Sequence, residues 1–259
     1  MREQRRKGPE GSIKKIGIIL FWILVWQLLS MTIHNSILLA GPVEAVIALK
    51  HMILTREYWD AIMFSLFRII GGFFFGSTLG IILAWLSYRV SLVEDILRPF
   101  ISVVKAVPVA SFVIILLIWA GNRILSFYIS ALVVLPLLYI NTLGGLKATD
   151  IKLLEMAEVF RIPMLRQLRH IYLPSVYPYL HSAFQTALGM AWKSGVAAEV
   201  IGQPLGSMGN GLYQSKIYLE TADLFAWTIT IVVVSFLVEK LFLKIAGYSI
   251  GRMKRSLIL

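Results

Sequence analysis

The stretch IGIILFWILVWQLLSMTI, residues 16–33, contains no charged residue. A helix needs about 20 predominantly apolar residues to cross the hydrocarbon core of a bilayer, so this stretch is nearly ideal for one span. Similar apolar runs follow along the rest of the chain at about 61–86, 101–120, 124–146, 176–202 and 224–246. The sequence therefore predicts six transmembrane helices.

The composition agrees with a membrane environment. Hydrophobic residues make up 58% of the 259 residues, charged residues only 15%, and the mean hydropathy is +0.78. Soluble domains are about half apolar and about one quarter charged. The sequence thus indicates an all-α integral membrane protein with no large extramembrane domain, so any soluble activity must come from a partner. The absence of cysteine excludes disulfides, thiolate metal sites and cysteine nucleophiles.

Basic residues set the expected topology. The formal net charge is +11, and most Lys and Arg residues lie in clusters between the apolar runs, beginning in residues 1–15. That start resembles a signal peptide, but the apolar run after it is too long and lacks a small-residue cleavage site, so we expect a retained first span. With a cytoplasmic N-terminus, the outside segments hold only Lys50, Arg56, Arg123 and Lys216. This bias predicts that both termini, residues 1–15 and the tail 251–259, are cytoplasmic, and it explains the charge without a nucleic-acid partner.

The longest inside connection, residues 147–175, has the pattern of two short amphipathic helices. Asp150 is the expected N-cap of the first helix, and Pro163 suits the first turn of the second. We expect the second helix to end at Leu173–Pro174. The apolar stripes of the two helices are Leu153, Met156, Ala157 and Phe160, then Leu165, Leu168, Ile171 and Tyr172. Such a pair could lie on the membrane surface or form a docking knob for a cytoplasmic partner.

Within this segment, Glu155-Met156-Ala157, Arg161 and Ile171-Tyr172-Leu173-Pro174 resemble the EAA motif of bacterial ABC importer permeases. The family pattern is Glu-Ala-Ala, three residues, Gly, nine residues and Ile-x-Leu-Pro, and every spacing matches. Met156 replaces the first alanine. Arg161 stands where the family usually has glycine, which bears on the turn geometry because glycine adopts backbone conformations that arginine resists.

The resemblance extends over about residues 16–250 and is closest to permeases of the nitrate, sulfonate, taurine and bicarbonate group. It implies a type I ABC importer transmembrane domain, methionine-importer-like, with six spans and coupling helices at about 150–172. Two copies, usually identical in this group, would enclose the pathway as a homodimer in the lipid. Supporting stretches are residues 41–46, 65–68 with Gly72, 105–108 and 197–199.

By resemblance, the chain is the permease subunit of an ATP-binding-cassette importer in the bacterial cytoplasmic (inner) membrane. It would pass a small solute, such as a sulfonate, nitrate or related anion, delivered by an extracytoplasmic solute-binding protein. The chain has no Gly-Lys pair and hence no P-loop, so we expect it not to be an enzyme. No catalytic residue, metal or cofactor is expected on it, since ATP and Mg would sit on a separate ABC ATPase dimer. The residues expected to couple to that ATPase are Glu155, Met156, Ala157, Arg161, Ile171, Leu173 and Pro174.

Charged residues inside the spans are the candidates for the translocation path, because each costs about 2.5 to 3.5 kcal/mol on insertion scales. Lys193 would suit an anionic substrate, or it forms a structural ion pair. Arg68 would line the path, bridge to a neighbouring helix or reach the outer interface. The full set of path candidates is Lys193, Ser194, Glu199 and Arg68.

Small residues and prolines predict how the spans pack. The ladder Gly72, Gly76 and Gly80 suits close helix packing, with a hinge as the alternative. Pro108 and Pro136 interrupt apolar runs and predict kinks.

Two other classes of function make different demands on the sequence. A membrane-embedded enzyme should show clustered acids or histidines within its spans, and this chain shows Glu199 and isolated cations. An ion-coupled secondary transporter would have no use for the EAA-like segment.

Overall fold

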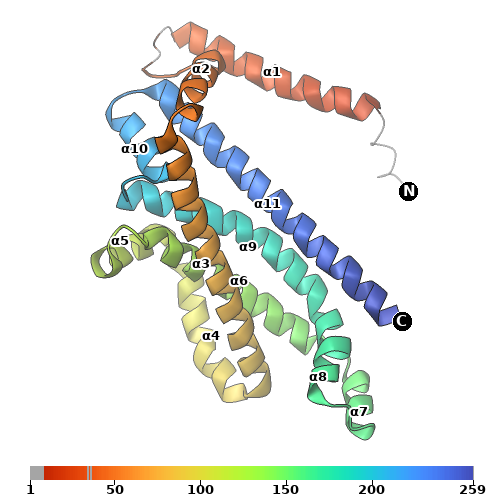
Figure 1. Ribbon diagram of the computed structural model, residues 1–259. Helices are drawn as coiled ribbons and strands as arrows, with labels where there is room; N and C mark the ends of the chain where they lie inside the picture. The colour runs from red at the N-terminus through yellow and green to blue at the C-terminus, as the bar shows by residue number, and fades with distance from the viewer. Residues whose placement is uncertain (1–8, 34, 36, 259) are drawn as a thin grey trace. The chain divides into compact units, whose positions relative to one another are not determined.

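The computed structural model describes the backbone of residues 9–33, 35 and 37–258 and the side chains of residues 14, 16–33, 35 and 37–245. No strand occurs among these residues, and helices follow one another with short connections (Figure 1). The all-α prediction is therefore confirmed.

The helices begin and end close to the boundaries of the apolar and amphipathic runs. A π-helical turn, η2, joins two of them without a break. The elements are α1 (Pro9–Ile33), α2 (Pro42–Ile53), α3 (Arg56–Arg89), α4 (Ser91–Ala106), α5 (Val109–Ala120), α6 (Leu125–Lys147), α7 (Ile151–Val159), α8 (Met164–Gln167), η2 (Leu168–Tyr172), α9 (Leu173–Gly202), α10 (Met208–Ile217) and α11 (Thr221–Ile258).

The chain divides into two compact units, and the first comprises Met1–Trp59 and Gly211–Ile231. Its bonds fix the turn after α1: the indole of Trp26 donates to the Ala40 carbonyl (3.1 Å), and the Ser30 hydroxyl donates to the Leu39 carbonyl (2.9 Å). None of the apolar stretch Ile16–Ile33 is buried inside the structure. A helix that is apolar and exposed on all sides requires lipid or another protein around it.

The second unit comprises Asp60–Asn210 and Val232–Leu259, and its core is built by α3, α6 and α9. The predicted glycine ladder lies where α3 meets α6. A Cβ on Gly72 or Gly76 would overlap the carbonyl oxygen of Phe127 or Ala131, and one on Gly80 would lie 2.7 Å from the Leu135 carbonyl oxygen. Only glycine permits such an approach, so the packing role predicted for this ladder is confirmed.

Four helices of the described chain are long and apolar enough to cross a membrane: Ile16–Ile33, Arg56–Arg89, Leu125–Lys147 and Thr221–Ile245. A fifth candidate is the pair α4 and α5, which is bent by 103°. The last predicted run, 176–202, lies within the 30-residue helix α9, which is long enough but less apolar because it carries Lys193 and Glu199. Six spans therefore remain a prediction, supported by four helices and a bent fifth.

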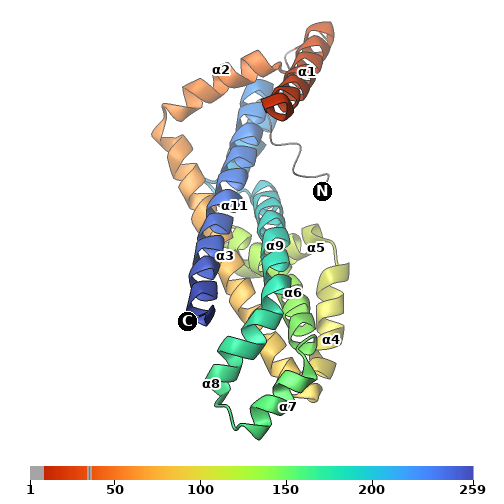
Figure 2. The same cartoon turned by 90° about the vertical axis from the view of Figure 1, so that its right-hand side faces the viewer.

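The predicted span at 101–120 is not a single straight helix. The chain runs along α4 to Ala106, then turns sharply into α5, as Figure 2 shows. The cause is Pro108, which has no amide hydrogen to donate and forces Val107 into an extended conformation with ψ 130°. The kink predicted at Pro108 is thus confirmed as a break, whereas α6 continues unbroken through Pro136.

Candidate functional site

The cytoplasmic segment predicted from the EAA-like motif folds into α7 and α8, which lie together at one end of α6 and α9 (Figures 1 and 2). Asp150 caps α7 as predicted, since its carboxylate accepts a bond from the Lys152 amide at 2.9 Å. This side chain satisfies one of the amides that a helix leaves unpaired at its start. The start of the segment is therefore fixed by its own sequence.

Arg161 adopts a left-handed conformation, with φ at +50°, directly after the end of α7. The Ile162 amide donates to the Ala157 carbonyl (2.8 Å), and the Arg161 amide donates to the Glu158 carbonyl (3.0 Å). These two bonds form a Schellman motif, in which the left-handed position is usually glycine. The EAA motif therefore usually has glycine at this position because the turn requires a left-handed backbone. In this chain Arg161 adopts the same turn, with some backbone strain.

Replacing Arg161 by glycine is expected to stabilise the protein by about 1 kcal/mol, because it removes the left-handed strain of a residue that carries Cβ. Thermal unfolding of the detergent-solubilised protein measures the change. Arg161→Ala is the control, since it removes the charge and keeps the strain. If alanine stabilises as much as glycine, the charge of Arg161 rather than its backbone conformation is responsible.

The second helix does not end at Leu173–Pro174, contrary to the prediction. The chain continues from α8 through η2 directly into α9, and Pro174 occupies the first turn of α9. Proline is tolerated in the first turn of a helix because it has no amide hydrogen that would be left unpaired there. The chain thus passes from α8 into α9 without an intervening loop.

Aromatic packing fixes this junction to α3. The ring of Tyr172 lies edge-on to those of Trp85 and Tyr88, with centroids 5.3 and 5.7 Å away. At the end of α3, the Arg89 guanidinium lies 2.9 Å from the sulfur of Met164 at the start of α8. The segment is therefore held at several points rather than lying loosely against the helices.

The predicted coupling residues divide into an exposed and a buried group. Ala157 and Ile171 are buried and hold α7 and η2 in place, and Leu173 is half-buried. The exposed members are Glu155, Met156, Arg161 and Pro174.

Large apolar side chains of the same segment are exposed as well. Ile151, Val159, Phe160 and Leu165 are each more than two thirds exposed. Exposed apolar side chains gathered around a few charges are typical of a protein-docking surface.

Glu199, one of the path candidates, lies fully buried where α3, α9 and α10 meet. Its carboxylate accepts bonds from the Ser65 hydroxyl (2.7 Å) and from the Gly209 amide (3.3 Å). The Ser65 oxygen in turn accepts a bond from the Met208 amide at 3.0 Å. Glu199 thereby holds the start of α10 against α3, which gives it a structural role in this structure.

Arg68 makes a bridge to a neighbouring element. Its Nε donates to the Arg123 carbonyl (2.6 Å) in the turn before α6, and its guanidinium lies over the ring of Phe64 at 3.4 Å. A backbone carbonyl and an aromatic face together compensate part of the cost of the charge.

Lys193 and Ser194 lie on a different side of α9 from Glu199. Lys193 is exposed and Ser194 is half-buried. The carboxylate of Glu199, by contrast, is hydrogen-bonded to α3 and α10. The structure therefore does not bring the four path candidates together into one cluster, and a path role for Lys193 and Ser194 stays a prediction.

Sequence reasoning missed the pairing of Ser65 with Glu199. The two residues are 134 positions apart, and a serine in an apolar run gives no signal of its partner. It also missed the ion pair of Lys147 with Glu94 at 2.6 Å, which joins the end of α6 to α4. The one hint in the sequence was Glu199 itself, because an acid within an apolar run requires a partner.

Comparison with known proteins identifies a family. The model described as "Binding-protein-dependent transport system inner membrane component" matches residues 76–248, more than half of the chain. The aliphatic sulfonates transport permease protein SsuC of Bacillus subtilis is 27% identical over 241 residues, 92% of this chain and 87% of that protein. SsuC of Escherichia coli is 28% identical over 235 residues, covering 90% and 86%. The bicarbonate transport system permease protein CmpB of Synechococcus elongatus is 23% identical over 266 residues, covering 92% and 94%.

Proposed function

Because the chain belongs to the family of binding-protein-dependent transport system inner membrane components, we propose that it carries a small anion across the cytoplasmic membrane as the permease of an ATP-driven importer. The family establishes a transport permease with several membrane helices. The anionic substrate, the arrangement of partners and the orientation of the termini are our proposals.

One observation carries the ATP-driven mechanism. The segment from α7 to η2 presents Glu155 on an exposed surface, and η2 continues directly into the membrane helix α9. A soluble ATPase bound to α7 and α8 could therefore move α9 as a lever. ATP and Mg would be bound by that ATPase, as a dimer, and not by this chain.

The other partners follow from the family and from exposed apolar surface. Delivery by an extracytoplasmic binding protein is supported by the family's description. A second, identical copy of the permease is supported by α1 and α5, which expose apolar side chains such as Trp22, Ile118 and Trp119. Basic residues are concentrated in residues 1–15, in the segment 147–175 and in the C-terminal tail. Because basic residues favour the cytoplasmic side of a membrane, this distribution supports cytoplasmic termini.

An anionic substrate is supported by two independent observations. The relatives described above are named for sulfonates and bicarbonate, which are both anions. Lys193 is an exposed cation in the second half of α9, where its charge would attract an anion in a water-filled path.

Transport by proteoliposomes tests the proposal. They would contain this chain with the ATPase recovered from its host, ATP in the lumen, and the binding protein with a labelled sulfonate or bicarbonate outside. We expect uptake with ATP and none with a non-hydrolysable analogue. Uptake driven by an imposed proton or sodium gradient without ATP would instead establish an ion-coupled transporter.

A further inference from the structure

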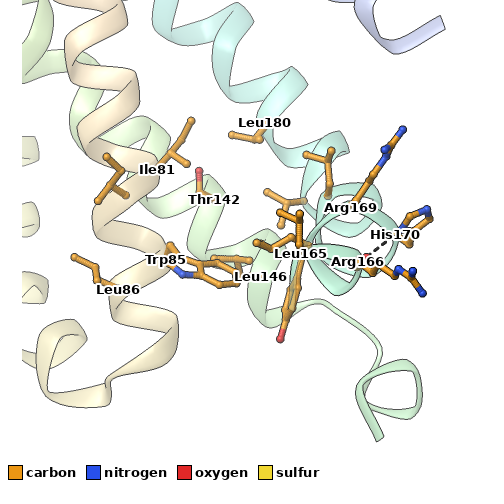
Figure 3. Close-up of a pocket in the computed structure, with 15 residues that line it drawn as sticks. Ile81, Trp85, Leu86, Thr142, Leu146, Leu165, Arg166, Arg169, His170 and Leu180 are labelled. Atoms are coloured by element: carbon orange, nitrogen blue, oxygen red, sulfur yellow. Dashed lines mark hydrogen bonds between the residues drawn. The ribbon is translucent and has the colours of Figure 1, made fainter. Parts of the chain in front are cut away.

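A cavity of about 840 Å³ lies between α3, α6, η2 and the start of α9. Its walls are almost entirely apolar, with the Thr142 hydroxyl as an exception. Figure 3 shows Ile81, Trp85 and Leu86 on one side of the cavity and Leu165 on the other, with Leu180 at one end. A cavity lined in this way favours apolar groups over water.

Basic residues lie along one side of this cavity. Arg166, Arg169 and His170 contribute to the lining, and their charged ends extend together from α8 and η2, away from Trp85 (Figure 3). Among the described residues that line the cavity, none is acidic. His170 is held in place through its Nδ1, which lies 3.0 Å from the Arg166 carbonyl oxygen. The site therefore combines a space for hydrocarbon with a cationic edge.

We propose that this cavity binds an acyl chain of an anionic phospholipid, whose phosphate contacts Arg166 and Arg169 at the edge. Guanidinium groups bind phosphate through paired bonds, and basic pockets between membrane helices bind anionic headgroups. An acyl chain beside Trp85 and Tyr172 would pack directly against η2. The bound lipid would brace the junction through which α8 is connected to α9, and this inference does not depend on the identity of the transported solute.

Native mass spectrometry of the purified, detergent-solubilised protein tests the proposal. Dioleoyl phosphatidylglycerol and dioleoyl phosphatidylcholine are titrated in parallel, and we expect one tightly held phosphatidylglycerol that phosphatidylcholine does not replace. The double change Arg166→Gln and Arg169→Gln should weaken phosphatidylglycerol binding by about 30-fold, because each charge removed weakens the binding by less than about tenfold and the two effects multiply. The pair Lys50→Gln and Lys216→Gln removes two exposed cations elsewhere and should leave binding unchanged.

A second variant tests the cavity separately from the charges. Leu180→Trp fills the space and keeps Arg166 and Arg169, so it should reduce the binding of both lipids. Glycerol phosphate, which has the headgroup charge without an acyl chain, should not displace the bound lipid. Equal binding of the two lipids by the wild type would overturn the proposal. Unchanged phosphatidylglycerol binding in both the filled variant and the glutamine variant would overturn it as well.

Discussion

Replacement of Glu199 by alanine is expected to lower the melting temperature of the detergent-solubilised protein by about 10 °C, because a buried network loses its acceptor. The Ser65 hydroxyl and the Gly209 amide both donate to the Glu199 carboxylate, which is fully buried. Leaving two buried donors without a partner, together with the space that alanine opens, costs about 3 to 5 kcal/mol. The melting temperature is measured by the change in intrinsic tryptophan fluorescence on heating.

Glu199→Gln is the matched control. Glutamine has nearly the same shape and keeps an oxygen that can accept from Ser65 and Gly209, so we expect a loss of about 1 kcal/mol at most. If glutamine and alanine destabilise the protein equally, the negative charge of Glu199 matters more than its hydrogen bonds. If neither variant lowers the melting temperature, the structural role assigned to this cluster is wrong.

Replacement of Glu155 by arginine is expected to weaken the association with the ATPase by more than 100-fold. Reversal of a charge at the centre of a docking surface costs about 3 kcal/mol or more, since the partner's complementary group is then repelled. Glu155 is exposed on α7, beside the half-exposed Met156 and the exposed Phe160. Its replacement therefore should leave the fold of the permease unchanged. The recovery of ATPase with the tagged permease, compared at equal amounts of permease, measures the loss.

Glu220→Arg serves as the control for this charge reversal. Glu220 is also exposed but lies between α10 and α11, remote in sequence from the EAA-like segment. The control should recover the ATPase as well as the wild type does. Equal recovery with all three proteins would show that Glu155 does not take part in the docking contact.

The sequence was most informative where a local rule determines the structure. Asp150 caps α7 because the side chain and the amide that it bonds are two residues apart. The glycines at 72, 76 and 80 recur every four residues, so they must share one face of a helix, and that face meets α6. The matching spacing around Arg161 predicted the position of the turn. The left-handed backbone conformation of Arg161 is recognised only in the structure, because an arginine in the sequence does not indicate such a conformation.

Predictions failed where the outcome depends on elements distant in the sequence. Leu173–Pro174 has the local pattern of a helix end, but the packing of Tyr172 on Trp85 and the π-helical turn carry the helix onward. Pro108 predicted a kink in the run at 101–120, but hydropathy does not report that the bend is as large as 103°. The sequence also gives no sign that Ser65 reaches Glu199.

Identification of the proteins that accompany this chain is the most direct test of the account. The tagged, full-length protein is purified in mild detergent from membranes of its native host, after brief cross-linking, and the recovered proteins are identified by mass spectrometry. The account predicts a P-loop ATPase that is recovered with the wild type and lost with Glu155→Arg. Absence of any P-loop ATPase from the cross-linked wild-type preparation would contradict an ATP-driven mechanism and favour a transporter coupled to an ion gradient.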